Sequence, residues 1–259
     1  NGSNHTMQYC DGTNWIAMGG APTAPTNGMV GYWKLDDGSS GTTPTTAVDS
    51  SGNGNTGTLT GGPTWTSSGK IGNALITGGG HKAVDLGNPA LLQITGSLTL
   101  TAWIKATSIN PSDADDMIIE KEIGTSVAYQ LKGSQDCTGV NLQDNLLLTV
   151  ASSASQTVYV ERCSNTILST STWYFVAGVY NAAAQTMNVY VNGVLDNGTL
   201  LSGPVPSSIN NSTATLKIGD TSDGGGTAYF NGTIDDARIY NRALSDEEIW
   251  NLYLATGGT

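Results

Sequence analysis

Hydrophobic and polar residues alternate along most of the chain, in short segments that turn-forming residues separate. Gly, Asn and Ser dominate the turns, and no segment before residue 244 has the 3.6-residue period of a helix. Alternation with period two places one face of a segment in a core, as a half-buried strand requires. We therefore predict strands at residues 29–35, 56–60, 73–76, 82–85, 97–106, 116–122, 127–132, 145–150, 157–161, 173–180, 186–191, 215–219 and 229–240.

The last predicted strand continues directly into a short helix. Strict alternation over residues 233–240 divides them between two faces, with Thr233, Asp235, Ala237 and Ile239 on one and Ile234, Asp236, Arg238 and Tyr240 on the other. The period changes at residue 244. Ser245 and Glu248 then have the spacing of a capping box, and the acidic residues 246–248 suit the positive end of a helix dipole. The pattern predicts an all-β protein that ends in one short helix.

Length and charge limit the class of protein and its partners. A chain of 259 residues with 38% hydrophobic residues can bury one good core. Only 12% of its residues are charged and its formal net charge is −11, which disfavours nucleic acid and anionic membranes as partners. No run approaches the roughly 18 apolar residues that a membrane span needs. The chain opens with Asn1 rather than Met, as a processed or excised product would, and we expect no membrane insertion.

Several segments resemble, in order, one family of domains. They are residues 31–37 (GYWKLDD), 49–59, 69–75, 97–104 (SLTLTAWI), 173–180, 187–193 and 232–245 (GTIDDARIYNRALS). These motifs are similar to those of the laminin-G-like, concanavalin A-like lectin and glucanase jellyroll domains. The resemblance covers roughly residues 28–256 and implies a two-sheet antiparallel jellyroll sandwich with one short C-terminal helix. It does not identify a ligand, because this fold carries many functions.

The first 27 residues differ from the rest of the chain. Residues 7–18 are typical of a small hairpin with Asp11-Gly12 as its turn, and the Pro/Thr run at 21–27 is typical of a linker. We therefore divide the chain into a hairpin-like segment with its linker at 1–27 and a jellyroll domain at 28–259. Residues 1–27 are either the last piece of an upstream module or an arm packed on the jellyroll.

The three cysteines favour one disulfide. Cys10, Cys137 and Cys163 have no C-x-x-C spacing and no nearby His, which argues against zinc and against a thiol nucleophile. Cys137 and Cys163 flank two apolar runs, so adjacent antiparallel strands would bring them together. We predict that these two cysteines are bridged, with Cα atoms within about 7 Å. Cys10 is then free or bonded to another chain.

The resemblance implies one structural Ca²⁺ that ties the first and last strands together. The Asp of the family's closing strand corresponds to Asp235, and the loop oxygens that would join it are those of Asp36, Asp49, Asn53, Gly54 and Asn55. The alternative is that Asp235 caps turn amides and that residues 50–55 are only a tight turn. Two further acidic clusters, at 113–116 and 220–224, are interpreted as solvated loops or as a second cation site.

Most large aromatic residues lie at strand positions that face a core, including Trp33, Trp103, Trp173, Phe175 and Tyr190. A sugar site needs an exposed aromatic face beside amide and carboxylate groups. Trp65, Tyr129 and Tyr159 lie on less regular segments. These three are the candidate ligand-binding residues.

The sequence favours recognition over catalysis. Glycosidases of the laminarinase type, which share the fold, carry two catalytic carboxylates in an E-x-D-x-x-E strand. Glu120 and Glu122 are the nearest feature here, but the intervening Asp and the third carboxylate are missing. We expect a non-catalytic extracellular module, at a cell or virion surface, that binds a glycan or a surface protein in adhesion. The alternatives are an assembly domain of a fibre, phage tail or surface layer, which would contact its own copies or neighbouring modules, and a glycoside hydrolase.

Overall fold

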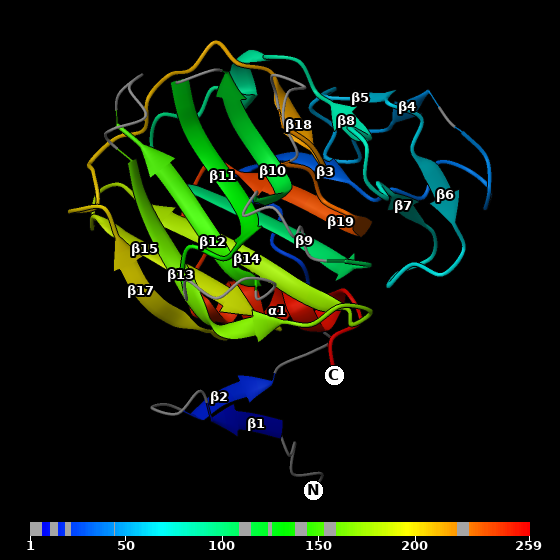
Figure 1. The fold of residues 1–259 in the computed structure, drawn as a ribbon. Helices are drawn as coiled ribbons and strands as arrows, with labels where there is room; N and C mark the ends of the chain where they lie inside the picture. Colours follow the sequence, from blue (N-terminus) through cyan, green and yellow to red (C-terminus); the bar gives the residue numbers. More distant parts are fainter. Residues whose placement is uncertain are drawn as a thin grey trace, which may run out of the picture.

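The chain folds into two antiparallel sheets that pack face to face, with one α-helix (Figure 1). The structure is a computed structural model that describes residues 7–10, 15–18, 22–43, 45–108, 115–123, 126–137, 144–152, 159–221 and 228–259, the first two segments by their backbone. The predicted all-β sandwich with a short C-terminal helix is confirmed. In the described part of the chain, no helix combines the length and the hydrophobicity that crossing a membrane requires.

One sheet has nine strands, and its middle strands build the candidate site. In spatial order they are β17 (Asn197–Leu201), β13 (Tyr159–Leu168), β12 (Asp144–Ala151), β11 (Ser126–Ser134), β10 (Asp116–Ile123), β18 (Leu216–Ile218), β8 (Ala83–Asp85), β5 (Gly57–Thr60) and β4 (Thr46–Ala47).

The other sheet has eight strands. In spatial order they are β16 (Val194–Leu195), β15 (Thr186–Val191), β14 (Tyr174–Asn181), β9 (Leu98–Ala106), β19 (Gly232–Tyr240), β7 (Ala74–Ile76) and β6 (Thr64–Thr66), with β3 (Met29–Trp33) also paired to β19. A separate hairpin joins β1 (Met7–Cys10) to β2 (Trp15–Met18), as the sequence predicted. Its predicted turn, Asp11-Gly12, lies outside the described residues. A short 3-10 helix, η1 (Ala90–Leu92), precedes β9.

The inner faces of the two sheets form the main core, because alternate residues of each strand point inward. Leu131 of β11 and Leu148 of β12 are paired and fully buried in this core. Leu100 and Ile104 of β9 enter it from the other sheet. The residues between these inward positions point to the outer face of each sheet.

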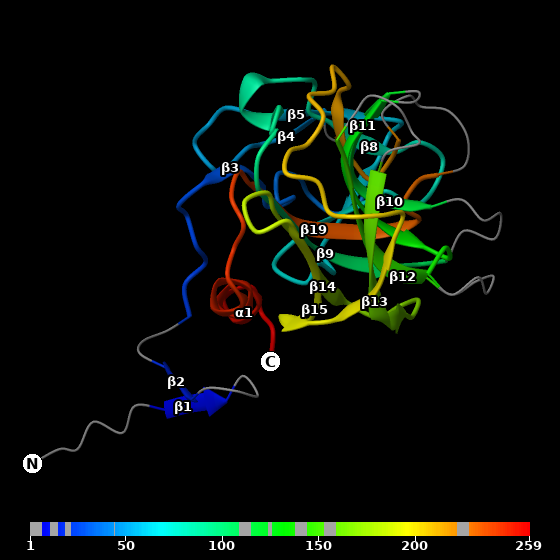
Figure 2. The ribbon, with the colours of Figure 1, turned by 90° about the vertical axis from the view of Figure 1, so that its left-hand side faces the viewer.

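Helix α1 (Asp246–Ala255) covers the outer face of the eight-stranded sheet (Figure 2). It begins with the predicted capping box, in which the Ser245 side chain accepts the Glu248 amide and the Glu248 side chain accepts the Ser245 amide. Below it, Trp103 stacks on Tyr253 at 5.7 Å between ring centroids, and the Trp103 indole donates to the Thr256 hydroxyl. The helix and this sheet face form a second hydrophobic core.

A β-bulge in β19 corrects the predicted division of its faces. Asp236 has a φ of 49°, and the register with β9 shifts between Asp235 and Arg238. Ile234, Ala237 and Ile239 therefore all reach the main core, whereas Tyr240 joins the core under the helix. Strict alternation, which placed Ile234 and Ile239 on opposite faces, was wrong because one residue is inserted at Asp236.

Every strand predicted from residue 28 onward is present, and the main errors are four short strands that were missed and the end of β13. The turn at Asn192-Gly193 joins β15 to β16, with both residues in the left-handed conformation that such turns favour. Strands β4, β6, β16 and β17 were missed, and β13 runs seven residues further than the predicted end at 161, to Leu168. Each missed strand has at most five residues, which is too short for a clear period.

Candidate functional site

A polar hollow of about 430 Å³ lies on the outer face of the nine-stranded sheet, over β10, β11, β12 and β13. Its volume lies within the range of about 300–1,000 Å³ that is usual for ligand pockets. We call it the polar hollow. It is lined by Asp115, Met117, Glu122, Val127, Gln130, Lys132, Asp136, Thr149, Tyr159 and Glu161.

Cross-strand pairing brings these side chains together. Gln130 of β11 pairs with Thr149 of β12, which pairs in turn with Glu161 of β13. Their neighbours Leu131 and Leu148 enter the core, so these polar residues point outward. The hollow thus stands on three rigid strands whose inner faces hold the fold together.

Lys132 is the central charge of the polar hollow. Its ammonium lies 2.8 Å from an Asp115 oxygen and 3.2 Å from a Glu161 oxygen, and its side chain is only 7% exposed. The Thr149 hydroxyl donates to the same Glu161 oxygen at 3.1 Å. Burial alone would lower the pKa of Lys132, but the Asp115 and Glu161 carboxylates raise it above its usual value. Lys132 therefore stays charged.

A further carboxylate, Glu122, borders the polar hollow on β10. The Gln130 amide donates to it. The register between β10 and β11 shifts between Lys121 and Glu122, so Glu122 stands opposite Val127. Glu120 and Glu122 form the glutamate pair that is nearest to the glycosidase motif. Glu120 is 2% exposed and does not line the hollow.

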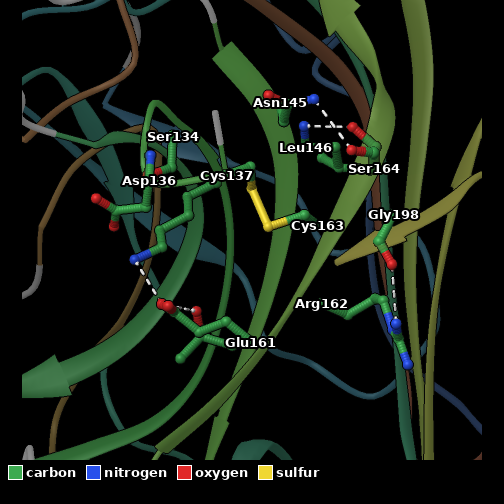
Figure 3. Close-up of a disulfide and its surroundings, with 12 residues drawn as sticks. Ser134, Asp136, Cys137, Asn145, Leu146, Glu161, Arg162, Cys163, Ser164 and Gly198 are labelled. Atoms are coloured by element: carbon green, nitrogen blue, oxygen red, sulfur yellow. Dashed lines mark hydrogen bonds and ion pairs between the residues drawn. A yellow bond between two sulfur atoms is a disulfide. The ribbon is translucent and has the colours of Figure 1, made fainter. Parts of the chain in front are cut away.

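A disulfide adjoins the polar hollow (Figure 3). Cys137 and Cys163 are bonded, with Cα atoms 5.9 Å apart, which confirms the predicted bridge. Cys163 follows Glu161 by two positions on β13, so both side chains lie on the outer face. Cys137 follows Asp136, which lines the hollow. The bridge thus ties the segment after β11 to β13 beside the site. The side chain of Cys10 lies outside the described residues.

Of the three predicted sugar-binding aromatics, only Tyr159 lies at this site. It is the first residue of β13, is half-buried and lines the polar hollow. Trp65 is 1% exposed and belongs to the main core. Tyr129 is fully buried there, and its hydroxyl donates to the Leu92 carbonyl at 2.7 Å. The expectation of exposed rings at Trp65 and Tyr129 was wrong, because inward strand positions take both into the core.

The loop that was predicted to supply Ca²⁺ ligands is hydrogen-bonded to backbone groups of its own residues and of β3. One Asp49 oxygen accepts the amides of Tyr32 and Ser51, and the other accepts the amide of Asn55. These bonds hold the pKa of Asp49 below its usual value although burial opposes them. Asp49 therefore acts as a turn-capping residue.

The other loop candidates brace β3. The Asn55 side chain donates to the Val30 carbonyl at 2.8 Å, and the Asn55 carbonyl accepts the Trp33 indole. The Asn53 side chain donates to the Met29 carbonyl, and Gly54 adopts a positive φ of 77°. These contacts are those of a tight turn at residues 50–55, the alternative to a cation-binding loop.

Asp235 and Asp36 meet at a different loop, residues 69–73. One Asp235 oxygen accepts the Ile71 amide at 2.8 Å, and an Asp36 oxygen accepts the Asn73 amide at 2.6 Å. The other Asp235 oxygen is buried and has no hydrogen-bond partner within the described residues. Burial raises the pKa of Asp235 to about 7, and the Asp236 and Asp36 charges add to this, against the backbone amides. Of the predicted set, these two carboxylates contact the same loop, and the Asp36 charge acts on Asp235.

The two further acidic clusters contain buried carboxylates. In the first cluster, Asp116 is 2% exposed and lies next to Gly133. It shares a hydrogen bond with Asp144 of β12, which is 4% exposed. Asp220 is 1% exposed and contacts the His81 ring nitrogen at 3.0 Å. Asp113 and residues 222–227 lie outside the described residues. Over the described part of the chain, no group of three or more His, Cys, Asp or Glu residues is arranged for a metal.

The family follows from residues 78–250, which match a laminin G-type model described as the concanavalin A-like lectin/glucanases superfamily. The chain belongs to this superfamily. The matched residues are more than half of the chain and include β8 to β19, so they contain every described residue of the polar hollow. A search of curated proteins found no match.

Solved structures show the same fold at low identity. Domain 4 of the extracellular arabinanase AbnA from Geobacillus stearothermophilus, in complex with arabinotriose, has a TM-score of 0.62 and 19% identity over 87% of this chain and 98% of that one. The binding domain of Paraclostridial Mosquitocidal Protein 1 has a TM-score of 0.62 and 15% identity, over 88% of this chain. The binding domain of botulinum neurotoxin DC, in complex with SialylT, has a TM-score of 0.56 and 15% identity, over 90% of this chain. The chain spans about half of each toxin structure, at 52%.

Proposed function

We propose that this domain is a non-catalytic recognition module that binds carbohydrate in the polar hollow. The observation that carries the proposal is the placement of Tyr159, half-buried, in one recess with an amide, a hydroxyl and carboxylates. A sugar ring presents an apolar face and a rim of hydroxyls. Tyr159 offers a surface for the first, and Gln130, Thr149 and Glu161 offer hydrogen-bonding groups for the second.

Rigidity of the site supports the same function. Lys132, Glu161 and Thr149 are fixed in one network on three paired strands, so the groups that would meet a ligand are already positioned. A pre-organised site loses less side-chain entropy on binding. The arabinotriose complex of the similar arabinanase domain and the SialylT complex of the similar toxin domain support a glycan as ligand.

The domain should bind glycans without hydrolysing them. Hydrolysis of a glycosidic bond needs one carboxyl group that donates a proton and a second that acts as nucleophile or base. Asp115 and Glu161 both form ion pairs with the Lys132 ammonium, so both carboxylates are held by this cation rather than left to act on a glycosidic bond. The network is therefore suited to holding a ligand rather than cleaving it.

We further propose an extracellular setting and a structural Ca²⁺ at Asp235 and Asp36. The disulfide supports an oxidising compartment, such as the cell exterior or a virion surface. The buried, unpartnered oxygen of Asp235 supports the ion, because an isolated buried carboxylate oxygen is costly and Ca²⁺ selects such hard oxygen ligands. A bound ion would fix the 69–73 loop against the closing strand β19.

The test is a glycan array followed by calorimetry on the best ligands. Asp136→Trp places a large side chain at the exposed rim of the polar hollow, and Glu247→Trp, on the exposed face of α1, is the matched control. We expect the wild type and Glu247→Trp to bind the same glycans, and Asp136→Trp to lose at least about tenfold in affinity, or about 1.4 kcal/mol. Equal binding by Asp136→Trp, release of sugar from a bound ligand, or no glycan binding by the wild type would each contradict the proposal.

A further inference from the structure

A second hollow adjoins the polar hollow at the start of β13. It also measures about 430 Å³, and we call it the serine hollow. It is lined by Ser152, Tyr159, Val160, Gln185, Ser202, Pro204, Val205, Pro206, Ser207 and Ser208. Tyr159 lines both hollows, so its side chain lies where the two recesses meet.

Hydrogen bonds anchor the segment that shapes the serine hollow. Residues 202–208 follow the edge strand β17, and the Gln185 amide donates to the Val205 carbonyl at 2.8 Å. The Tyr180 hydroxyl donates to the Pro206 carbonyl at 2.7 Å. Directly after the segment, the Ile209 amide donates to the Thr95 carbonyl at 2.8 Å. The recess is therefore held by both sheets.

We propose that the two hollows are consecutive subsites for one linear oligosaccharide that carries no acidic groups, with Tyr159 at the junction. The inference rests on the proposed function and specifies its ligand. Each hollow lies in the usual size range of a ligand pocket, about 300–1,000 Å³, so a sugar that fills one leaves the other empty. Affinity should therefore rise with chain length until both are filled.

The charges of the two hollows select against acidic sugars. Among the described residues that line it, the polar hollow has four carboxylates, from Asp115, Glu122, Asp136 and Glu161, and one cation, Lys132, which already contacts two of them. A uronic or sialic acid carboxylate would face this excess of negative charge without a cation of its own. Within the part of the chain that the structure describes, the lining of the serine hollow contains no charged side chain, and its exposed serine hydroxyls suit neutral hydroxyl groups.

The experiment measures affinity against chain length and charge. The probes are the neutral arabinan, cellulose and chitin oligomers from disaccharide to hexasaccharide, with galacturonic acid oligomers of equal length and sialyllactose as acidic counterparts. Ser207→Trp fills the exposed side of the serine hollow, and Ser40→Trp, at an exposed turn before the opposite edge strand β4, is the control. Tyr159→Ala and Tyr159→Phe test the junction.

For at least one neutral series we expect the longer oligomers to bind about tenfold more tightly than the disaccharide, and the acidic probes to bind at least about tenfold more weakly. Ser207→Trp should lose the gain with length but keep the disaccharide affinity, whereas Ser40→Trp should match the wild type. Tyr159→Ala should weaken all neutral ligands, and by more than Tyr159→Phe, which keeps the aromatic ring at the junction.

Several results would contradict the proposal that the two hollows are consecutive subsites. They are affinity independent of chain length, an unchanged length dependence in Ser207→Trp, or acidic oligomers that bind as well as neutral ones. If neutral glycans bind and Asp136→Trp abolishes binding, any of these results leaves the proposed function standing and removes only the second subsite. If the wild type binds no probe, both inferences fail together.

Discussion

Lys132 and Glu161 form an ion pair across an intervening strand, with nitrogen and oxygen 3.2 Å apart. Lys132 lies on β11 and Glu161 on β13, while Thr149 of the strand between them, β12, donates its hydroxyl to the same carboxylate. The pair therefore fixes the floor of the polar hollow over three strands. Both partners are buried, so each depends on the other for charge compensation.

Lys132→Met should destabilise the domain by about 3–5 kcal/mol, because the Asp115 and Glu161 carboxylates would remain together without a cation. Urea denaturation at neutral pH measures the change in the free energy of unfolding. Lys34→Met removes an exposed lysine and serves as the control, with an expected change of less than about 0.5 kcal/mol. Equal stability of the two variants would show that the network is not important for folding.

Removal of the disulfide should lower the free energy of unfolding by about 3 kcal/mol, since the bridge closes a loop with a sequence separation of 26. The double variant Cys137→Ser/Cys163→Ser should show this loss in chemical denaturation and should also bind glycan more weakly, because the bridge adjoins Asp136. Cys10→Ser, which leaves the bridge intact, should do neither. A similar loss in Cys10→Ser would indicate that Cys10 has a structural role of its own.

Asp144 should make the domain less stable at alkaline pH. Burial raises its pKa above the usual value; a hydrogen bond from Asp116 opposes this shift, and the Asp115 charge adds to it. A carboxyl whose folded-state pKa is raised stabilises the fold fully below its unfolded-state value and loses that contribution as pH rises through the folded-state value. Asp144→Asn should therefore melt higher than the wild type at pH 8 and close to it at pH 4. The measurement is the melting temperature as a function of pH.

The opposite result is a larger increase in melting temperature for Asp144→Asn at pH 4 than at pH 8. It would show that the folded-state pKa of Asp144 is not raised. The same melting curves on Asp85→Asn are the control, because Asp85 is a carboxylate on β8 of the same sheet.

Calcium should raise the melting temperature of the wild type and not that of Asp235→Asn. An ion that binds only the folded state at about a hundredfold excess over Kd stabilises it by about 2.7 kcal/mol. Asp49→Asn is the matched control. Because both Asp49 oxygens accept backbone amides, its replacement should lower stability in calcium and in EDTA alike and leave the difference intact. If the wild type melts at the same temperature in calcium and in EDTA, the proposed Ca²⁺ site is wrong.

The sequence predicted the sandwich because long strands have a clear period and the motifs of the family occur in order. It failed at Asp236, where alternation breaks. Tyr32, 204 positions away, donates to the Asp236 carboxylate at 2.7 Å, and Arg238 binds the same carboxylate. Because the bulge at Asp236 is stabilised by Tyr32, which is distant in the sequence, the residues next to Asp236 show no pattern that reveals it. The family motif that contains Asp236 was nevertheless evident.

The candidate site was harder to predict than the fold. Gln130, Thr149 and Glu161 are separated in the sequence and meet only through strand register. The available signal was polar residues at the outward positions of strands that are otherwise strongly hydrophobic, such as Gln130 and Lys132 beside Leu131. Trp65 and Tyr129 were assigned to a site because their segments looked irregular, but burial depends on contacts that local sequence does not show.

Because helix α1 covers the outer face of the eight-stranded sheet only, the outer faces of the two sheets differ in how well they tolerate substitutions. The face beneath it is filled by Trp103, Tyr253 and their neighbours, so most changes there remove core atoms. The rim of the polar hollow, by contrast, includes the exposed Asp136 and the half-buried Tyr159, which can be replaced without opening the main core. A library randomised at these rim positions should yield folded variants with altered glycan preference, so that specificity can diverge while thermal stability stays constant.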